Sequence, residues 1–192
     1  MSPSGEAPRA EAELVAKARL GDAQAFTALV EQHAERLHAF IHRLCGDSEL
    51  AVDLTQETFL RAWRGIRGFD GQSAFYTWLY RIGRNTVISA ARARAARPVV
   101  SASIGTEAGE VAEPAVASDP SQALEQAERV ALVLAALQQL PFEFREIIVL
   151  RDVEDRSYEE IAAVLEIPAG TVRSRLFRAR ERLRETLGGR GA

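Results

Sequence analysis

The C-terminal region carries a dense set of arginines that could bind nucleic acid. Six of them lie between residues 173 and 184, where Glu181 is the single acid. An arginine guanidinium is a planar donor that pairs with a phosphate, or with the edge of a guanine, through two parallel hydrogen bonds. This density of arginine favours a DNA-binding helix over its alternative, a solvated helix with no ligand.

Helical periodicity assigns these residues to faces. Four apolar residues fall on one stripe at 100° per residue and are expected to face the core: Val172, Leu176, Ala179 and Leu183. The outward face is expected to hold Ser174, Phe177, Arg178 and Glu181, with Arg173 and Arg175 at its margins. An aromatic side chain off the buried stripe favours a binding role for this face.

A second helix must precede the arginine-rich one. Ser157 followed by Glu160 is a capping box, so a short helix is expected over residues 158–165. Residues 166–168 end that helix, and Gly170-Thr171 opens the next one, at the spacing of a helix-turn-helix. This motif indicates DNA binding but not the process, and it would suit a repressor or a response-regulator output domain equally well.

A second candidate nucleic-acid surface lies in residues 73–97. This segment holds five arginines and no acid, with Tyr76 and Trp78 among its aromatic residues. Arginines that follow phosphates, combined with rings that hold splayed bases, are what unpaired nucleic acid requires. Phe75 and Leu79 are expected in the core, and Trp78 fits core packing and base contact equally well. The opposite face is expected to hold Arg81, Arg84, Asn85, Ile88 and Arg92, with Asn85 the best candidate for a base contact.

The helix expected over residues 48–67 offers a surface for a protein partner. Its wheel predicts a buried side of Val52, Gln56, Phe59, Leu60 and Trp63. Its outer side is predicted to hold Asp53, Leu54, Glu57, Arg61 and Arg64. A leucine among mixed charges suggests a partner such as a charged coiled coil, although a single exposed leucine is also ordinary.

The sequence shows no convincing pattern for a metal site or an enzyme active site. His38, His42 and Cys45 share one helix face, but no fourth ligand follows at a regular spacing, so we expect no metal site. No glycine-rich phosphate loop and no serine triad are visible. We therefore expect neither an enzymatic activity nor a cofactor.

Composition limits the class of protein. The 192 residues carry a net charge of -3 and one cysteine, which excludes a disulfide scaffold. Apolar runs fall far short of the roughly 20 residues of a membrane helix, and the N-terminus has no apolar leader segment. We therefore expect a soluble cytoplasmic protein.

The charge pattern predicts two lobes. Residues 98–128 hold three prolines, six acids and no basic residue, which is typical of a flexible linker that ends in a helix. We expect an all-α fold with domains at 1–97 and 129–192 and this linker between them. Helices are expected at 11–20, 23–45, 48–67, 73–94, 121–139, 142–152, 158–165 and 169–187.

Three long segments in this order carry a family resemblance. DLTQETFLRAW and SAFYTWLYRIGRN, followed by SYEEIAAVLEIPAGTVRSRLFRARERL, closely resemble the extracytoplasmic-function (ECF, group IV) sigma factors of bacterial RNA polymerase. The resemblance covers nearly the whole chain. It implies sigma domain 2 in the first lobe, sigma domain 4 in the second, and a role in promoter recognition and DNA melting.

The resemblance also implies site residues. The polymerase-binding set is Asp53, Leu54, Gln56, Glu57 and Arg61, although Gln56 falls on the side predicted to be buried. The minus-ten set is Phe69, Asp70, Ser73, Trp78, Arg81, Arg84, Asn85 and Arg92. The minus-thirty-five set is Thr171, Arg173, Ser174, Arg175, Phe177 and Arg178.

The implied partners are promoter DNA, the beta-prime clamp helices and beta flap of core RNA polymerase, and a cognate anti-sigma factor that is often membrane-anchored. The acidic linker is expected either to run through polymerase channels as a mimic of nucleic acid or to act as a soluble spacer. Two other functions remain open on the residues alone. They are a stand-alone DNA-binding regulator and an adaptor that binds polymerase without starting transcription.

Overall fold

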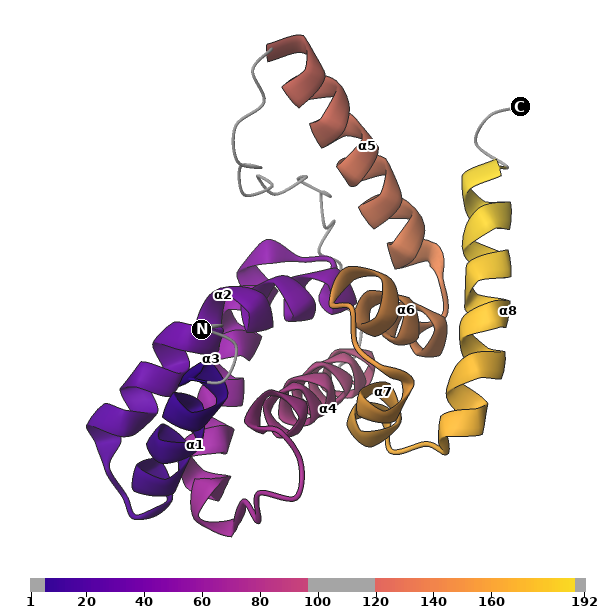
Figure 1. The fold of residues 1–192 in the computed structure, drawn as a ribbon. Coiled ribbons are helices and arrows are strands. Elements are labelled where there is room, and N and C mark those ends of the chain that lie inside the picture. The colour runs from indigo at the N-terminus through magenta and orange to yellow at the C-terminus, as the bar shows by residue number, and fades with distance from the viewer. Residues whose placement is uncertain (1–5, 97–119, 189–192) are drawn as a thin grey trace.

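The computed structural model describes residues 6–96 and 120–188, and every regular element in these ranges is helical, as the sequence predicted (Figure 1). The first lobe contains α1 (Glu6–Arg19), α2 (Ala23–Cys45), α3 (Ser48–Gly65), the 3-10 turn η2 (Ile66–Gly68) and α4 (Phe75–Ala96). The second contains α5 (Pro120–Gln139), α6 (Phe142–Ile148), the π-helical turn η3 (Val149–Val153), α7 (Tyr158–Leu165) and α8 (Ala169–Gly188). Residues 98–119 of the predicted linker lie outside the described residues, and residues 120–128 belong to α5.

Local capping fixes the helix boundaries of the first lobe. Asp22 Oδ1 accepts hydrogen bonds from the backbone N–H groups of Gln24 and Ala25 at 2.9 and 3.1 Å, and so begins α2. Asp47 begins α3 in the same way through Leu50 N at 3.0 Å. Between them, Gly46 ends α2 in the left-handed region at φ 74°. These are the breaks that the sequence predicted.

Close helix packing builds the core of the first lobe. Leu37, Phe40 and Ile41 of α2 are fully buried. A Cβ at Gly83 of α4 would lie 3.2 Å from the Leu37 side chain and 3.6 Å from that of Thr58, so a larger residue there would crowd the side chains of α2 and α3. Glycine at this position therefore allows the three helices to meet closely.

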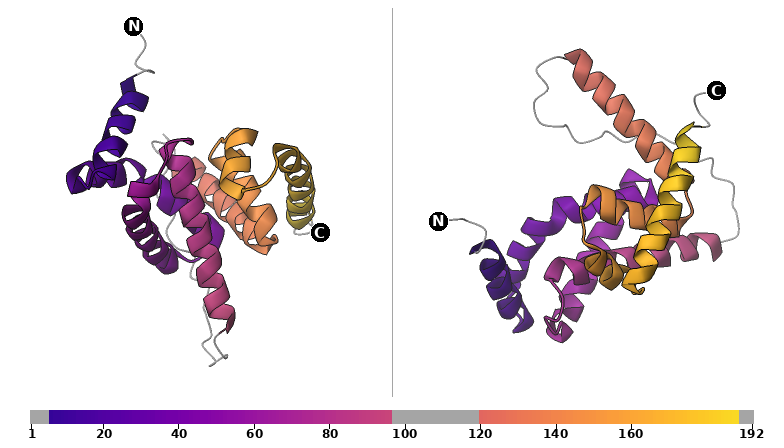
Figure 2. Two further views of the ribbon diagram at one scale, coloured as in Figure 1. Left: turned by 90° about the horizontal axis from the view of Figure 1, so that it is seen from below. Right: turned by 45° about the vertical axis from the view of Figure 1, so that its right-hand side comes forward.

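The second lobe packs α6, η3 and α7 against α8. Val172, Leu176 and Ala179 of α8 are buried, as the periodicity predicted. The C-terminal part of α5 contacts α8, whereas the first turns of α5 project away from the rest of the lobe (Figure 2). No helix in the described part of the chain is long and apolar enough to cross a membrane.

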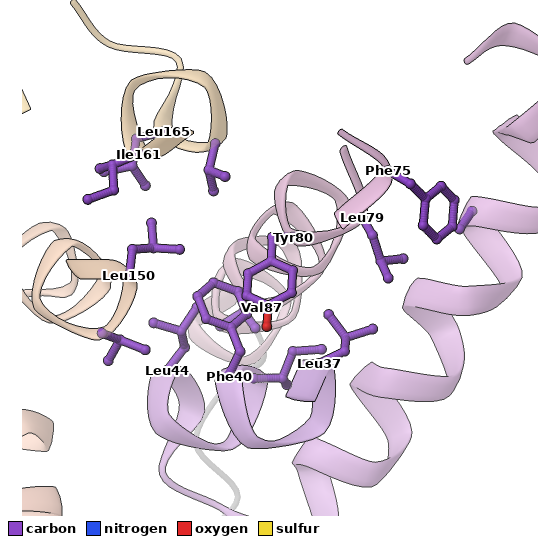
Figure 3. Packing of buried hydrophobic residues seen from close by; sticks show 14 of the residues in the cluster. Leu37, Phe40, Leu44, Phe75, Leu79, Tyr80, Val87, Leu150, Ile161 and Leu165 are labelled. Carbon is purple, nitrogen blue, oxygen red and sulfur yellow. The ribbon is translucent and has the colours of Figure 1, made fainter. Parts of the chain in front are cut away.

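The two lobes pack against each other and share one core. In Figure 3, Phe40, Leu44 and Tyr80 of the first lobe face Leu150 and Ile161 of the second. The rings of Phe40 and Tyr80 also pack at a tilt, with centroids 4.5 Å apart. Tyr80, Leu150 and Ile161 are each at most 1% exposed. The sequence predicted two lobes but not this contact between them.

Candidate nucleic-acid interface

Helix α8 presents the predicted DNA-reading face to solvent. Ser174 and Arg178 are exposed, and the ring of Phe177 is 64% exposed. An open groove of about 470 Å³ runs along this face, lined by Gly170, Arg173, Ser174, Phe177 and Arg178. An arginine fork and an apolar ring on one exposed helix face suit a guanine edge and a thymine methyl group in the DNA major groove.

The elements before α8 hold it in place. The Ser157 hydroxyl accepts from Glu160 N at 3.2 Å, and Glu160 Oε2 accepts from Ser157 N at 2.7 Å, so the predicted capping box is confirmed. Glu166 ends α7 in the left-handed region at φ 56°. Arg180 forks onto Asp152, with its Nε 3.1 Å from the carboxylate. These contacts fix the helix-turn-helix as a rigid unit.

Two members of the predicted minus-thirty-five set are less exposed than the others. Thr171 is half-buried in the first turn of α8, where its carbonyl accepts from Ser174 Oγ at 3.1 Å. Arg175 turns toward α6, and its side chain is 19% exposed. Its guanidinium lies 3.9 Å from Glu143 and 3.8 Å from Glu146. Arg175 therefore has protein partners here, whereas Arg173 and Arg178 face solvent.

Helix α4 exposes part of its predicted outward face. Asn85 and Arg92 are exposed, and Asn85 Oδ1 accepts from Arg84 at 3.4 Å. Arg84 was predicted to face outward, but its side chain is only 18% exposed. Its guanidinium forks onto Glu146 at 2.7 and 3.2 Å. Arg81 lies 3.6 Å from Glu166. The packing of the second lobe explains both differences, because it places acids opposite these arginines.

The loop before α4 is built around a buried ring. Phe69 is 5% exposed and packs on Phe75 and Trp78 with centroids 6.1 and 5.0 Å away. Phe69 is a member of the predicted minus-ten set, and its ring is covered by other aromatic side chains in this structure. Trp78 is half-buried in the same cluster.

The polar residues of this loop are better placed to contact a ligand. Asp70 is exposed and accepts from Gln72 N at 3.0 Å, which shapes the turn. Gly71 adopts φ 75° next to it. Ser73 is half-exposed. These backbone and side-chain groups leave an open polar edge beside the first turn of α4.

On α3 the predicted faces are wrong for four residues. Leu54 is 7% exposed and belongs to the core, so it is not the exposed leucine that suggested a partner. Val52 and Leu60, predicted to be buried, are 47% and 50% exposed. Gln56 is exposed as well, which removes the conflict with its implied role. Asp53 and Arg61 are exposed, as predicted, and Arg61 pairs with Glu57 at 2.7 Å.

Threonines explain the changed phase of α3. The buried stripe is made of Ala51, Leu54, Thr55, Thr58, Phe59 and Ala62. The hydroxyls of Thr55 and Thr58 each donate to the carbonyl four residues earlier at 2.6 Å, so neither is left unsatisfied. Small side chains on this stripe allow close approach to α2 and α4, which a count of apolar residues does not detect.

A groove beside α3 escaped the sequence reasoning. It has a volume of about 510 Å³ and lies between α2 and α3. Its walls are mostly apolar. The residues that line it are Ala23, Phe26, Thr27 and Val30 of α2, with Gln56, Phe59, Leu60 and Trp63 of α3. The signal that could have found it is Leu60, an apolar residue flanked by charges once the correct phase is known.

Two buried acids between the lobes were also missed. Glu146 and Glu154 are 1% and 8% exposed. Burial raises the pKa of the Glu146 carboxyl, while the bonds from Arg84 act in the opposite direction. Burial also raises the pKa of the Tyr80 phenol, so this hydroxyl stays protonated and donates to Glu154 at 3.0 Å. The available signal was the position of Glu146 directly before the apolar run 147–150.

The histidine face does not form a metal centre. The rings of His38 and His42 lie parallel at 6.3 Å, and Cys45 Sγ lies within hydrogen-bond distance of the Asp47 carbonyl at 3.3 Å. Burial lowers the pKa of His42. Within residues 6–96 and 120–188, no three His, Cys, Asp or Glu side chains could hold a metal ion.

Both lobes match defined protein families. Residues 29–97 match sigma-70 region 2, and residues 130–183 match sigma-70 region 4. The RNA polymerase sigma-H factor of Pseudomonas aeruginosa is 41% identical over 179 residues, which cover 91% of this chain and 92% of the relative. The ECF RNA polymerase sigma-E factor of Escherichia coli K12 is 38% identical over 174 residues, or 88% and 89% of the two chains.

Solved structures agree with these relatives. CnrH, in complex with the cytosolic domain of CnrY, superposes with a TM-score of 0.68 at 29% identity, over 94% of this chain and 98% of that one. The sigma factor RpoE of Bartonella quintana, in complex with the anti-sigma factor NepR, gives 0.67 at 28% identity, over 86% and 98%.

The fold and the matches to sigma-70 regions 2 and 4 thus define a bacterial transcription initiation factor. More specifically, the chain belongs to the ECF sigma factors of the sigma-70 family. Its function is that of an RNA polymerase sigma factor in promoter recognition and transcription initiation.

Proposed function

We propose that the chain reads two promoter elements, the minus-thirty-five element with α8 and the minus-ten element with α4 and the loop 69–74. The exposed face of α8 carries this assignment, since Ser174, Phe177 and Arg178 lie together on the solvent side of a helix-turn-helix. The proposed units are residues 1–97, a linker at 98–128 and residues 129–192.

Capture of an unpaired base drives DNA opening in this proposal. Asn85 and Arg92 are exposed on α4, and Asp70 and Ser73 edge the preceding loop. A base held there offsets an unstacking cost of a few kcal/mol and shifts thermal opening toward the melted state. Arg81, Arg84 and Trp78 join this surface once α4 is uncovered. No hydrolysis is needed.

Polymerase docks on α3 in this proposal. The exposed Asp53, Gln56 and Arg61, with Glu57, form a charged row that suits the beta-prime clamp helices. Leu60 and the groove beside it supply apolar area next to this row. The beta flap is assigned to the second lobe, where α5 exposes Val130, Leu132 and Val133. Docking at both lobes raises the effective concentration of each DNA-reading helix.

A cognate anti-sigma factor is the proposed inhibitor. CnrH and the Bartonella RpoE, both similar to this chain, are each described in complex with a protein partner, and NepR is named as an anti-sigma factor. An inhibitor that covers α3 and the second lobe would prevent polymerase binding. The proposed location is the bacterial cytoplasm, where RNA polymerase works.

Reconstituted transcription tests the proposal. The purified chain is added to core RNA polymerase with a bacterial genomic template library, and transcript starts are mapped. Initiation at defined sites, with a shared upstream sequence, supports the proposal. Specific binding to duplex DNA without polymerase supports a stand-alone regulator instead. Binding to polymerase without initiation supports an adaptor, and either result contradicts the proposed role.

A further inference from the structure

One buried carboxylate joins the two helices that the proposed function assigns to DNA. Glu146 of α6 is 1% exposed. Arg84 of α4 forks onto it at 2.7 and 3.2 Å, and Arg175 of α8 lies 3.8 Å from it. The two arginine side chains are only 18% and 19% exposed. A fork onto a carboxylate has the geometry of a fork onto a phosphate, so an arginine engaged by Glu146 is not free to bind DNA.

A second buried acid repeats this arrangement. Glu154, in the turn after η3, accepts from Tyr80 at 3.0 Å and from Arg43 at 3.3 Å, and Arg36 lies 3.6 Å away. Closer to solvent, Arg81 of α4 pairs with Glu166 at 3.6 Å. The ion pairs of Arg36, Arg43 and Arg81, like that of Arg84, each join a base of the first lobe to an acid of the second. The second lobe therefore places acids opposite α2 and α4.

Other contacts fit the lobes together without charge pairing. Arg145 of α6 donates to the Leu44 carbonyl, and Gln138 of α5 donates to the Arg43 carbonyl at 2.8 Å. The guanidinium of Arg156 lies 4.0 Å from the centroid of the Tyr76 ring. Tyr76 and Arg81 are half-buried at this junction. The second lobe therefore covers one side of α4 while leaving Asn85 exposed.

We propose that this compact arrangement is an autoinhibited state of the free chain, in which Glu146 takes the place of DNA phosphate at Arg84 and Arg175. The inference rests on the proposed function of α4 and α8. Promoter binding requires the lobes to separate, since Arg84 of the first lobe cannot contact DNA and Glu146 of the second lobe at the same time. Core polymerase favours the separated state by holding each lobe at its own site.

The replacement Glu146→Gln tests the proposal in the full-length chain. It keeps the side-chain shape and removes the charge that holds both arginines. We expect a larger radius of gyration by small-angle X-ray scattering. We also expect about tenfold tighter binding to a mixed-sequence duplex and to a single-stranded oligonucleotide, because a shift of the closed state toward the open one raises apparent affinity in proportion.

Glu143→Gln is the matched control. It removes the same charge one turn earlier on α6, from a side chain that is 58% exposed and lies 3.9 Å from Arg175. Because Glu143 does not contact Arg84, this variant should stay compact and bind DNA like the unmodified chain. Equal gains in affinity for both variants would attribute the effect to net charge and would overturn the proposal.

Arg84→Gln gives an independent reading of the same contact. It breaks the only ion pair that Glu146 makes with the described part of the first lobe and leaves this buried carboxylate with Arg175 alone, so it should expand the chain as well. Far-ultraviolet circular dichroism confirms that each variant keeps its helices. If Glu146→Gln fails to fold, a compact Arg84→Gln still overturns the proposal.

The two conclusions fail separately. Failure of the unmodified chain to initiate transcription with core polymerase would refute the proposed function. Normal initiation, combined with an extended unmodified chain in solution or with a compact Glu146→Gln variant of unchanged DNA affinity, would refute autoinhibition alone.

Discussion

At the residue scale, Asn85 is expected to separate DNA opening from polymerase binding. Its amide is exposed on α4 among arginines, whereas the proposed polymerase-docking residues belong to α3. Asn85→Ala should therefore weaken open-complex formation by about 1–3 kcal/mol, the usual value of a base contact. Permanganate footprinting of melted promoter DNA measures this loss, and a binding titration measures affinity for core polymerase.

Ser89→Ala is the control for this prediction. Ser89 is exposed one turn further along α4, and its hydroxyl donates to the Asn85 backbone carbonyl at 2.8 Å. This variant should melt DNA normally. An equal loss of melting and of polymerase affinity in Asn85→Ala would argue against a base contact.

Arg178 is expected to act on the upstream element alone. It is exposed beside Phe177 on α8, whereas the core contacts of the helix are made by Val172 and Leu176. Arg178→Ala should lower upstream recognition by about 1–3 kcal/mol and leave core polymerase affinity unchanged. A nuclease footprint of the holoenzyme should lose its upstream protection.

Arg182→Ala provides the comparison for Arg178. Arg182 lies one turn further along α8 and pairs with Glu185 at 2.9 Å. Its removal should leave the footprint nearly unchanged, because an exposed pair of this kind contributes little. A footprint that is equally damaged by both replacements would mean that α8 reads only charge.

At the scale of elements, the junction between α2 and α3 depends on Gly46. The left-handed backbone there costs a residue with a side chain about 1–2 kcal/mol. An added Cβ would also lie 2.6 Å from the Gln138 side chain, which donates to the Arg43 carbonyl at 2.8 Å. Gly46→Ala should therefore lower the free energy of unfolding by more than the backbone cost. Urea denaturation measures the change.

Gly71→Ala isolates the backbone cost. Gly71 has nearly the same φ, 75°, but a Cβ there would meet nothing within 4 Å. Both replacements put a side chain on a residue in the left-handed conformation, which lowers the free energy of unfolding. Only Gly46→Ala also disturbs Gln138. Equal losses of stability would show that the Gln138 contact contributes nothing.

At the scale of the whole molecule, Tyr80 links the two lobes. Its ring packs on Phe40, and its hydroxyl donates to the buried Glu154. Tyr80→Phe keeps the ring and removes one donor from a buried carboxylate, which should cost about 1–3 kcal/mol. Calorimetry should show a lower unfolding temperature for this variant.

Tyr76→Phe is the counterpart of that variant. Tyr76 lies at the same junction, but its ring face contacts Arg156. Loss of its hydroxyl keeps this ring contact, so the unfolding temperature should change little. A similar decrease in both variants would contradict a specific role for the Tyr80 hydroxyl.

A structural feature could be predicted from the sequence when the residues that determine it are close together along the chain. The break at Gly46-Asp47 and the capping box at Ser157 were predictable, because their partners lie within three residues. The phase of α3 was not, since Gly83 and Thr58 decide how close the helices come. The burial of Phe69 likewise depends on Trp78, across a loop whose path is set by packing.

By itself, the sequence determined the helices, their order, the family and the outward face of α8, because periodicity and capping act between residues one or two turns apart. Only the tertiary structure decided which arginines face solvent. Arg84 finds Glu146 at a separation of 62 residues, and Arg43 finds Glu154 at 111. A buried carboxylate needs a partner, and helical periodicity holds no information about a partner on another lobe.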